Sequence, residues 1–311
     1  MWFGTEDYAT WIEPPLAGAD SSPQAWSSDG VTLNGFGYAF NSVNSHKVYN
    51  YAWSGASTRQ AAQQMRDFAN GLYGTGKIYF IDPTIRELNV LPARWANPVM
   101  TADYEGPSLT PGLEVQRTIQ ASGAVNGLPA SVATYDFAQY VTTVTDLNQY
   151  SVYVPIPEGY AIVVTAFGNS STGNGATSPG VFVHTTSGSS LGTGVRAPLI
   201  DDIATKTASV SNAQDVVLTN QNGSNPGVRI RIGEMLGQDA TGVLTIRGIQ
   251  ARLFPIDEAT DMLLNGTQYE GFTTGMGHEG CRFVGKPTYI THNRVNGGQI
   301  EFATTLKETL F

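Results

Sequence analysis

The sequence contains little charge and almost no cysteine. Charged residues make up 14% of its 311 positions, whereas an average soluble domain has about a quarter. Cys281 is the one cysteine, so no disulfide can form within the chain and the fold must depend on packing alone. A single cysteine leaves the cellular compartment undecided.

Basic clusters and long apolar runs are missing as well. The chain has 17 Lys and Arg against 26 Asp and Glu, for a formal net charge of -9. That balance argues against binding to nucleic-acid phosphates or to an anionic membrane surface. No stretch approaches the ~20 apolar residues of a membrane span, and acids stand where a signal peptide needs a basic region. We expect no nucleic-acid partner, no membrane insertion and no export.

Glycine, by contrast, is abundant, with 35 residues against a usual share of about 7%, which favours turn-rich β structure. Eight short strand-like segments separated by turn residues follow residue 112 and predict an antiparallel β-sandwich. These segments are LEVQRTI, ASVATYDF, SVYVPIP, YAIVVTAF, VFVHTT, DVVLTN, VRIRI and GVLTIRGIQARLF. The segment after Pro255, IDEATDMLLNGTQYEG, is interpreted as a polar connector.

One helix is predicted, in the first hundred residues. Ser57 and Gln60 form a capping-box pattern, and Met65, Phe68 and Leu72 recur at helical spacing. We expect the helix to run from about residue 58 to residue 70 and to stop at the following glycines. KVYNYAW before it and KIYFID after it have the patterns of strands.

The domain organisation follows from one aperiodic stretch. Residues 101–112, TADYEGPSLTPG, mix Gly, Pro and polar residues without a period, which indicates a linker. The last forty residues are too few for an independent core, and GQIEFATTLKETLF alternates as a strand with one wet face. We therefore expect a domain boundary in this linker, a β-sandwich after it, and a C-terminal strand that completes a sheet elsewhere in the chain.

Few residues suggest chemistry. Gly71, Gly76 and Lys77 match part of a phosphate-binding loop, but a helix precedes them and a strand follows, the reverse of the order that such a loop requires. Ile78 also stands where the loop needs a hydroxyl. We interpret these glycines as a helix-to-strand turn and expect no nucleotide cofactor.

His278 and Cys281 are the most tempting pair. A nucleophile needs a base and an orienting third group, and a zinc site needs three or four ligands, of which Glu279 and His292 could be imagined as the others. Nothing in the spacing requires either site. A buried, inert cysteine beside a glycine-rich turn is the favoured interpretation, and we expect no metal and no cofactor.

The remaining polar candidates are weaker. Asp201 and Asp202 are adjacent, and adjacent residues of a strand face opposite sides, so a solvated loop is preferred to a glycosidase pair. His46 and His184 lie in strand-like segments and are interpreted as hydrogen-bonded polar positions. Several aromatic residues could stack on sugar rings if exposed, although core positions are favoured. They are Trp26, Trp53, Trp95, Tyr153, Tyr160 and Phe167.

In addition, the chain resembles a known family, the minor tail proteins of phages that infect actinobacteria, which are similar to the distal tail proteins of long-tailed phages. The stretches that carry the resemblance are WIEPPLAG, SHKVYNYAWSG, FANGLYGTGKIYFIDP, LPARWANP, VPIPEGY, QARLFP, GMGHEGCRFVGKPT and FATTLKETL. They lie near the start, in the middle and at the end of the chain, and residues 168–225 match nothing in the family.

The resemblance implies a fold and a function. The fold is mainly β. A ring-forming belt domain with one helix, residues 1–103, would be completed by the C-terminal strands in residues 268–311, and a galectin-like or jelly-roll sandwich of residues 106–262 would be inserted into it. The function is that of a structural virion protein at the tail tip, a homohexameric ring that joins the tail tube to the adhesion apparatus after assembly in the host cytoplasm. Its partners would be the tube and other tail-tip proteins. An alternative is a module that binds host cell-wall glycans, and a glycan-cleaving enzyme is disfavoured because no acid/base pair is visible.

Overall fold

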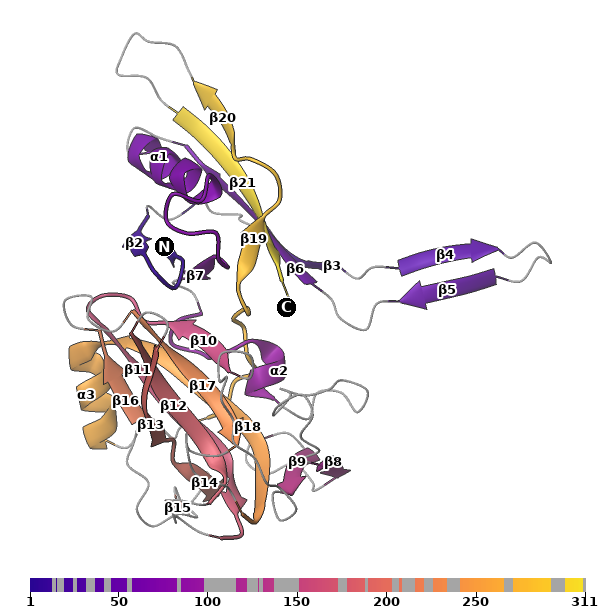
Figure 1. Cartoon of the computed structure of the whole chain (residues 1–311), viewed down its shortest axis with the longest axis vertical. Helices are drawn as coiled ribbons and strands as arrows, with labels where there is room; N and C mark the ends of the chain where they lie inside the picture. Colours follow the sequence, from indigo (N-terminus) through magenta and orange to yellow (C-terminus); the bar gives the residue numbers. More distant parts are fainter. Residues whose placement is uncertain are drawn as a thin grey trace. The chain divides into compact units, whose positions relative to one another are not determined.

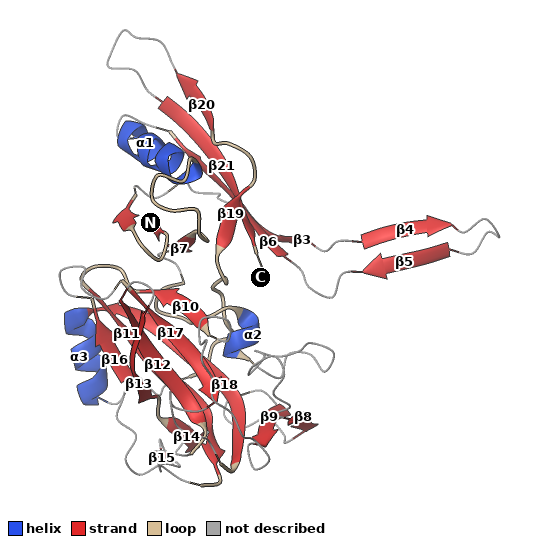
Figure 2. Ribbon diagram, in the orientation of Figure 1, coloured by secondary structure: helices blue, strands red, loops and turns tan. Residues whose placement is uncertain are grey.

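The structure is a computed structural model, and it describes most of the chain. The described residues are 1–12, 15, 20–24, 27–31, 37–41, 46–54, 58–82, 85–97, 116–121, 128, 131–136, 151–172, 178–187, 190–202, 207–208, 216–220, 226–233, 241–265, 271–291 and 300–309. The fold is mainly β, with several sheets and, within these residues, three helices (Figures 1 and 2).

The chain divides into two compact units. The first unit consists of Met1–Phe80 and His278–Phe311, and the second unit consists of Ile81–Gly277. Both ends of the chain therefore contribute to the first unit, while the second unit is continuous in sequence.

The strands of the first unit and of its border form three sheets. β2, β1 and β7 make a three-stranded sheet, β4 and β5 a two-stranded sheet, and β19, β21, β6 and β3 a larger sheet in which β20 also pairs with β21. The strands are β1 (Trp2–Gly4), β2 (Ala9–Trp11), β3 (Asp20–Gln24), β4 (Ser27–Val31), β5 (Gly37–Asn41), β6 (His46–Trp53), β7 (Tyr79–Ile81), β19 (Cys281–Phe283), β20 (Thr288–Thr291) and β21 (Ile300–Glu308).

The C-terminal strand β21 lies in the middle of the larger sheet. It runs antiparallel to β6, with Phe302 opposite Trp53 and Leu306 opposite Tyr49. Phe302 and Leu306 are buried, while Ala303 between them is exposed. The predicted alternation of this strand is confirmed, and so is its role in completing a sheet begun near the N-terminus.

Helix α1 (Thr58–Ala69) covers the inner side of this sheet. Its Met65 and Phe68 are buried in a core with Phe3 and Trp53, and the Phe3 and Phe68 rings lie 5.1 Å apart between centroids. The predicted helix is confirmed. Leu72 was wrongly placed on its apolar face: the helix ends at Ala69, and Leu72 lies in the turn beyond it, 68% exposed.

Shortening a side chain on the buried face of helix α1 should destabilise the protein far more than shortening a side chain on its exposed face. We expect Phe68→Ala to lower the free energy of unfolding by about 3 kcal/mol or more, because it leaves a cavity among packed aromatic rings. Arg66→Ala, whose side chain is 53% exposed, should change stability by less than about 0.5 kcal/mol. Equal urea midpoints for the two variants would contradict this assignment of the helix faces.

The second unit contains two larger sheets, consistent with a β-sandwich. One has the order β10-β17-β12-β13, and the other has the order β15-β14-β11-β18-β9-β8, with β16 also paired to β11. The strands are β8 (Gln116–Ala121), β9 (Ser131–Asp136), β10 (Val152–Pro155), β11 (Tyr160–Ser170), β12 (Gly180–Ser187), β13 (Ser190–Arg196), β14 (Leu199–Asp202), β15 (Thr207–Ala208), β16 (Val216–Thr219), β17 (Gly227–Gly233) and β18 (Val243–Pro255).

All eight strand-like segments of the sequence are strands in the structure. The expectation of purely antiparallel pairing was wrong at one place, because β11 and β14 pair in parallel, with Ala166 opposite Leu199. Sequence patterning alone does not distinguish the two pairings when a strand is buried on both faces, as the apolar run of β11 is.

The connector after Pro255 is a helix instead. Helix α3 (Ile256–Asn265) buries Ala259 and Met262, three residues apart, against Ala161 and Val163 of β11. Its first turn carries Asp257 and Glu258, where acids interact favourably with the helix dipole. The short helix α2 (Ala93–Ala96) also lies in this unit.

The unit borders differ from the expected ones at residues 103 and 268. Residues 86–91 hydrogen-bond along β18: Leu253 donates its N–H to the Arg86 carbonyl, and Val90 donates to the Ala251 carbonyl. The buried Asn89 amide donates to the carbonyls of Ile249 and Thr273, at 3.0 and 2.8 Å. These bonds hold both connecting segments to the second unit, and the linker predicted at residues 101–112 lies outside the described residues.

Position 277 requires glycine because its backbone lies directly against the backbone of Val90. A Cβ atom there would lie 1.8 Å from the Val90 carbonyl oxygen, whereas a Cβ on Gly76 would meet nothing within 4 Å. We expect Gly277→Ala to cost about 1 to 3 kcal/mol or more, because backbone atoms must move to accommodate it. Gly76→Ala is the matched control, and thermal melts in which both variants unfold at the wild-type temperature would contradict the close approach.

Candidate functional site

The candidate site is the segment that contains His278 and Cys281, at the start of the chain's return to the first unit. The His278 ring lies among three aromatic side chains, with its centroid 4.2 Å from that of Phe80 and 5.7 Å from that of Tyr49. Cys281, the first residue of β19, is fully buried, and its backbone pairs with Ile78 in an isolated bridge. The predicted burial of this cysteine is confirmed.

Hydrogen bonds fix the protonation of the imidazole. Gly280 donates its backbone N–H to His278 Nδ1 at 3.1 Å, so Nδ1 must be an acceptor. Nε2 then carries the proton and donates it to the Phe80 carbonyl at 3.2 Å. The pKa of His278 is lowered from 6.5 to about 3, chiefly by burial and in smaller part by the charges of Lys47 and Lys77. The ring is therefore neutral at physiological pH.

The thiol is close to the ring but poorly suited to attack. Cys281 Sγ lies 3.6 Å from His278 Nδ1. Burial raises the pKa of Cys281 well above 9, and the charge of Glu308 raises it further. Because a cysteine nucleophile must be a thiolate that its substrate can reach, this geometry favours the packing interpretation over a catalytic pair.

Charged residues around the pair hold backbone groups. The buried Glu308 carboxylate accepts the N–H of Glu279 at 3.1 Å and that of Lys47 at 3.4 Å. The Lys77 ammonium donates to the carbonyl oxygens of Glu279 and Thr309, at 3.2 and 3.4 Å. Lys77 thus lies between a helix and a strand and binds the C-terminal segment, as expected of a turn residue and unlike a phosphate-loop lysine.

The other polar candidates are scattered. Asp201 and Asp202 end strand β14, so the loop expected for them was wrong. His46 and His184 lie in β6 and β12, as predicted, and His184 is buried. No group of three or more His, Cys, Asp or Glu that could hold a metal ion occurs within the described ranges, and His292, imagined as a zinc ligand, lies outside them.

Most of the aromatic candidates belong to the core, as favoured from the sequence. Trp53, Trp95, Tyr153 and Phe167 are buried. Tyr160 is half-buried, and its hydroxyl accepts a hydrogen bond from Arg86 at 2.6 Å. Trp26 lies outside the described residues. None of these four buried side chains is therefore exposed for stacking on a sugar ring.

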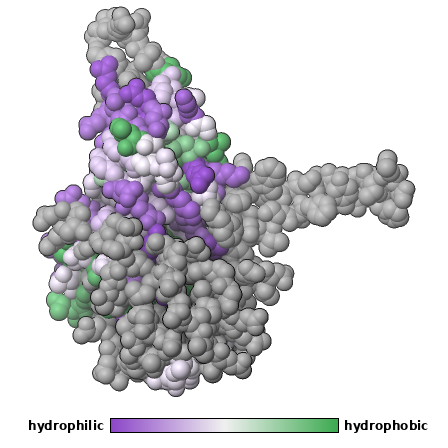
Figure 3. Space-filling view, viewed as in Figure 1, coloured by the Kyte–Doolittle hydropathy of each residue, from purple (hydrophilic) through white to green (hydrophobic). Residues whose placement is uncertain are grey.

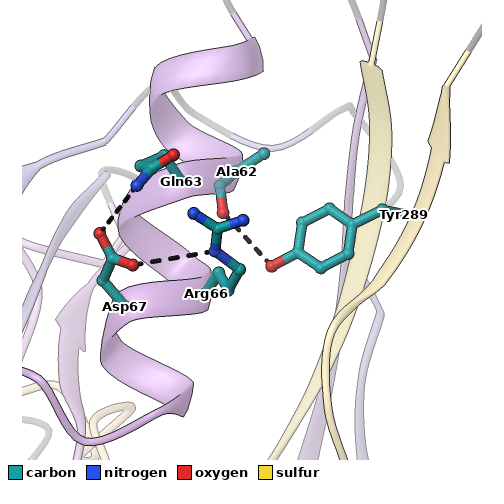
Figure 4. Close-up of polar contacts among 5 residues, drawn as sticks. All are labelled: Ala62, Gln63, Arg66, Asp67 and Tyr289. Atoms are coloured by element: carbon teal, nitrogen blue, oxygen red, sulfur yellow. Dashed lines mark hydrogen bonds and ion pairs between the residues drawn. The ribbon is translucent and has the colours of Figure 1, made fainter.

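A surface beside helix α1 was not anticipated from the sequence. In Figure 4, the Tyr289 hydroxyl of β20 reaches the helix and donates to the Ala62 carbonyl at 3.3 Å. Burial raises the pKa of this phenol above 10, so it stays protonated as a donor. Asp67 accepts from Gln63 at 3.4 Å and lies 3.8 Å from Arg66. Gln63, Arg66 and Asp67 all belong to the helix, whereas the Tyr289 hydrogen bond joins β20 to it.

Known proteins offer no guide to this site. Comparison of the chain with protein-family models, with curated proteins and with solved structures found no match. Among the described residues, no helix is long and apolar enough to cross a membrane.

The neutral His278 makes stability depend on pH. Its pKa is about 3 in the folded protein and about 6.5 when unfolded. Its contribution is complete above pH 6.5 and falls by roughly 1.4 kcal/mol per pH unit as the pH drops toward 3, because the unfolded chain binds the proton more readily. His278→Gln should remove this slope. We expect the stability difference between the two proteins in urea titrations to shrink between pH 7 and pH 4.5; a constant difference would contradict the burial of a neutral ring.

Proposed function

We propose that the protein is a structural component of a phage tail tip, a homohexameric ring that joins the tail tube to the adhesion apparatus. The tail assignment rests on the sequence stretches that resemble actinobacteriophage minor tail proteins. Two properties of the first unit support an assembling role: a hairpin that no other described strand joins, and a nearly neutral charge.

The hairpin is the observation that carries the proposal. β4 and β5 pair with each other over five residues each, and no other strand of the described chain joins their sheet. An isolated two-stranded hairpin is marginally stable in water. A neighbouring subunit that covers the hairpin would supply the missing packing, and repetition of that contact in one direction closes a ring.

The charge of the chain is divided unequally between the units. By sequence, the first unit has eight Lys and Arg against nine Asp and Glu, and the second unit has nine against 17. The formal charges are thus -1 and -8. A nearly neutral surface associates without mutual repulsion, whereas a strongly charged one stays solvated. This division suits a first unit that contacts its own copies and a second unit that faces solvent or other partners.

Glycan binding by the second unit is the weaker alternative. The galectin-like nature of that unit is part of the proposal and is supported by its two large sheets. A sugar site normally needs an exposed aromatic platform, and the buried Trp95, Tyr153 and Phe167 do not provide one. No observation in the described chain favours glycan binding over assembly.

Removing the hairpin tests the ring. Gln24 and His46 are opposite one another in the β3–β6 pair, so residues 25–43 can be replaced by a short Gly/Ser turn without separating these strands. We expect the wild-type chain to form hexamers by native mass spectrometry, and the shortened chain to lose them while keeping its melting temperature.

Leu264→Ser is the matched control, because Leu264 is 79% exposed on α3 of the second unit. It should leave the hexamer intact. A wild-type chain that is monomeric at all concentrations, or a shortened chain that assembles normally, would contradict the proposal. Antibodies against the second unit should label the tip of the tail in purified phage.

A further inference from the structure

The β1–β2 hairpin gives the first unit an outer strand edge at β2 (Figure 1). β2 is the end strand of the order β2-β1-β7, and within the described residues it pairs only with β1. Such an edge can accept a strand from another chain. On the visible side of this unit, Figure 3 shows mostly hydrophilic surface with a few separate hydrophobic patches. A partner there would meet small sites rather than one broad apolar surface.

The hydrogen bonds of the hairpin show which backbone groups point outward. Thr5 donates its N–H to the Tyr8 carbonyl at 2.8 Å, and Gly4 and Ala9 form the next pair along the ladder. Bonded pairs alternate with non-bonded pairs between antiparallel strands, so Gly4 and Ala9 are a non-bonded pair. The N–H and C=O groups of Ala9 therefore point away from β1, toward the outer edge of the sheet.

Exposed aromatic side chains lie on both sides of this peptide group. Tyr8 is 41% exposed and Trp11 is 48% exposed, and residues of these two types carry much of the binding energy of protein interfaces. The Tyr8 ring is stacked on that of Tyr73, with 4.3 Å between centroids. The Tyr73 ring lies 4.7 Å from that of the buried Phe68. Tyr8 is thus a platform that the core holds in position.

A carboxylate lies beside the platform. Asp7 is exposed, and a Cβ atom added to Gly74 would lie 3.4 Å from its Oδ2 atom, so the carboxylate lies against the residue that follows Tyr73. Among the described residues, no lysine or arginine forms an ion pair with Asp7. An arginine is attracted both to a carboxylate and to the face of an aromatic ring. Asp7 and Tyr8 together are therefore complementary to an arginine.

We propose that β2 docks an extended segment of a partner protein, which pairs with the Ala9 peptide group and places an arginine on Tyr8 beside Asp7. β2 has only three residues, so side-chain contacts must add to the backbone pairing. Side chains alternate between the two faces of a strand, which puts Tyr8 on one face and Trp11 on the other. The added segment would then contact an aromatic ring on each face.

The contact is small, and it is separate from the proposed ring. A site of a few residues belongs with weak, transient interfaces, so we expect millimolar affinity for a short peptide. The site uses neither the β4–β5 hairpin nor the tail assignment. Failure of peptide binding would therefore leave the ring proposal standing, and a chain that forms no hexamers would leave the docking site standing.

A titration of the full chain with synthetic peptides tests the proposal. The probe is the peptide TVRVT with blocked ends, whose arginine would face Tyr8 while its valines face Trp11. Two-dimensional NMR should show saturable shifts of the Ala9 amide and the Trp11 indole signals. Citrulline in place of the arginine keeps the shape without the charge and should weaken binding at least about threefold. Methylation of the peptide's backbone nitrogens removes its donors and should weaken binding at least as much.

Variants of the chain assign the contacts. Tyr8→Ala and Asp7→Asn should each weaken binding at least about threefold. Asp261→Asn, at an exposed acid of α3, is the matched control and should bind as wild type does. Ala9→Pro removes the outward N–H and leaves the bonds to β1 in place, so it should lose peptide binding at an unchanged melting temperature.

If Ala9→Pro melts early, the methylated peptide makes the same test on the wild-type chain. The proposal is overturned by a wild-type chain whose Ala9 and Trp11 signals do not shift. Binding that stays unchanged with citrulline, with the methylated peptide or in Asp7→Asn also overturns it.

Discussion

The pairing of β21 with β6 is the contact on which the first unit depends. It places the last described strand of the chain between β19 and β6, next to a strand formed near the beginning, with Phe302 stacked on Trp53 at 4.4 Å. Helix α1 and the aromatic core then pack on the side of the sheet that this pair creates. Without β21, the tyrosines and tryptophan of β6 would face water and a central sheet edge would lie open.

The return of the chain to that sheet is secured by polar groups that are buried and bonded. His278 uses both ring nitrogens, and Glu308 accepts two backbone N–H groups. On the other side of the border, Asn89 bonds to β18 and to Thr273. Buried polar groups stabilise one arrangement strongly because a broken bond leaves a desolvated group. In this protein they lie near the points where the chain passes from one unit to the other.

The surfaces that remain suit contacts between proteins. The first unit combines a β4–β5 hairpin that no other described strand joins with a formal net charge of -1. The acidic charge is concentrated in the second unit, which keeps an assembly soluble. A pair such as His278 and Cys281 looks catalytic in the sequence, but in the fold both side chains are buried, and burial favours the neutral forms of the imidazole and the thiol.

The sequence by itself determined the elements whose pattern is local. Period-two alternation identified the eight strands of the second unit and β21, and helical spacing identified α1 through Met65 and Phe68. It also favoured a buried Cys281. Local patterns missed helix α3. Only two of its ten residues, Ala259 and Met262, are buried, so its sequence resembles a polar loop until the strand on which it packs is known. Tertiary structure alone decided the parallel pairing of β14, the borders at residues 80 and 277, the neutral tautomer of His278 and the exposure of Ile290. Each depends on atoms far apart in the chain, and the energy of a hydrogen bond or a buried surface is fixed only when both partners are in place.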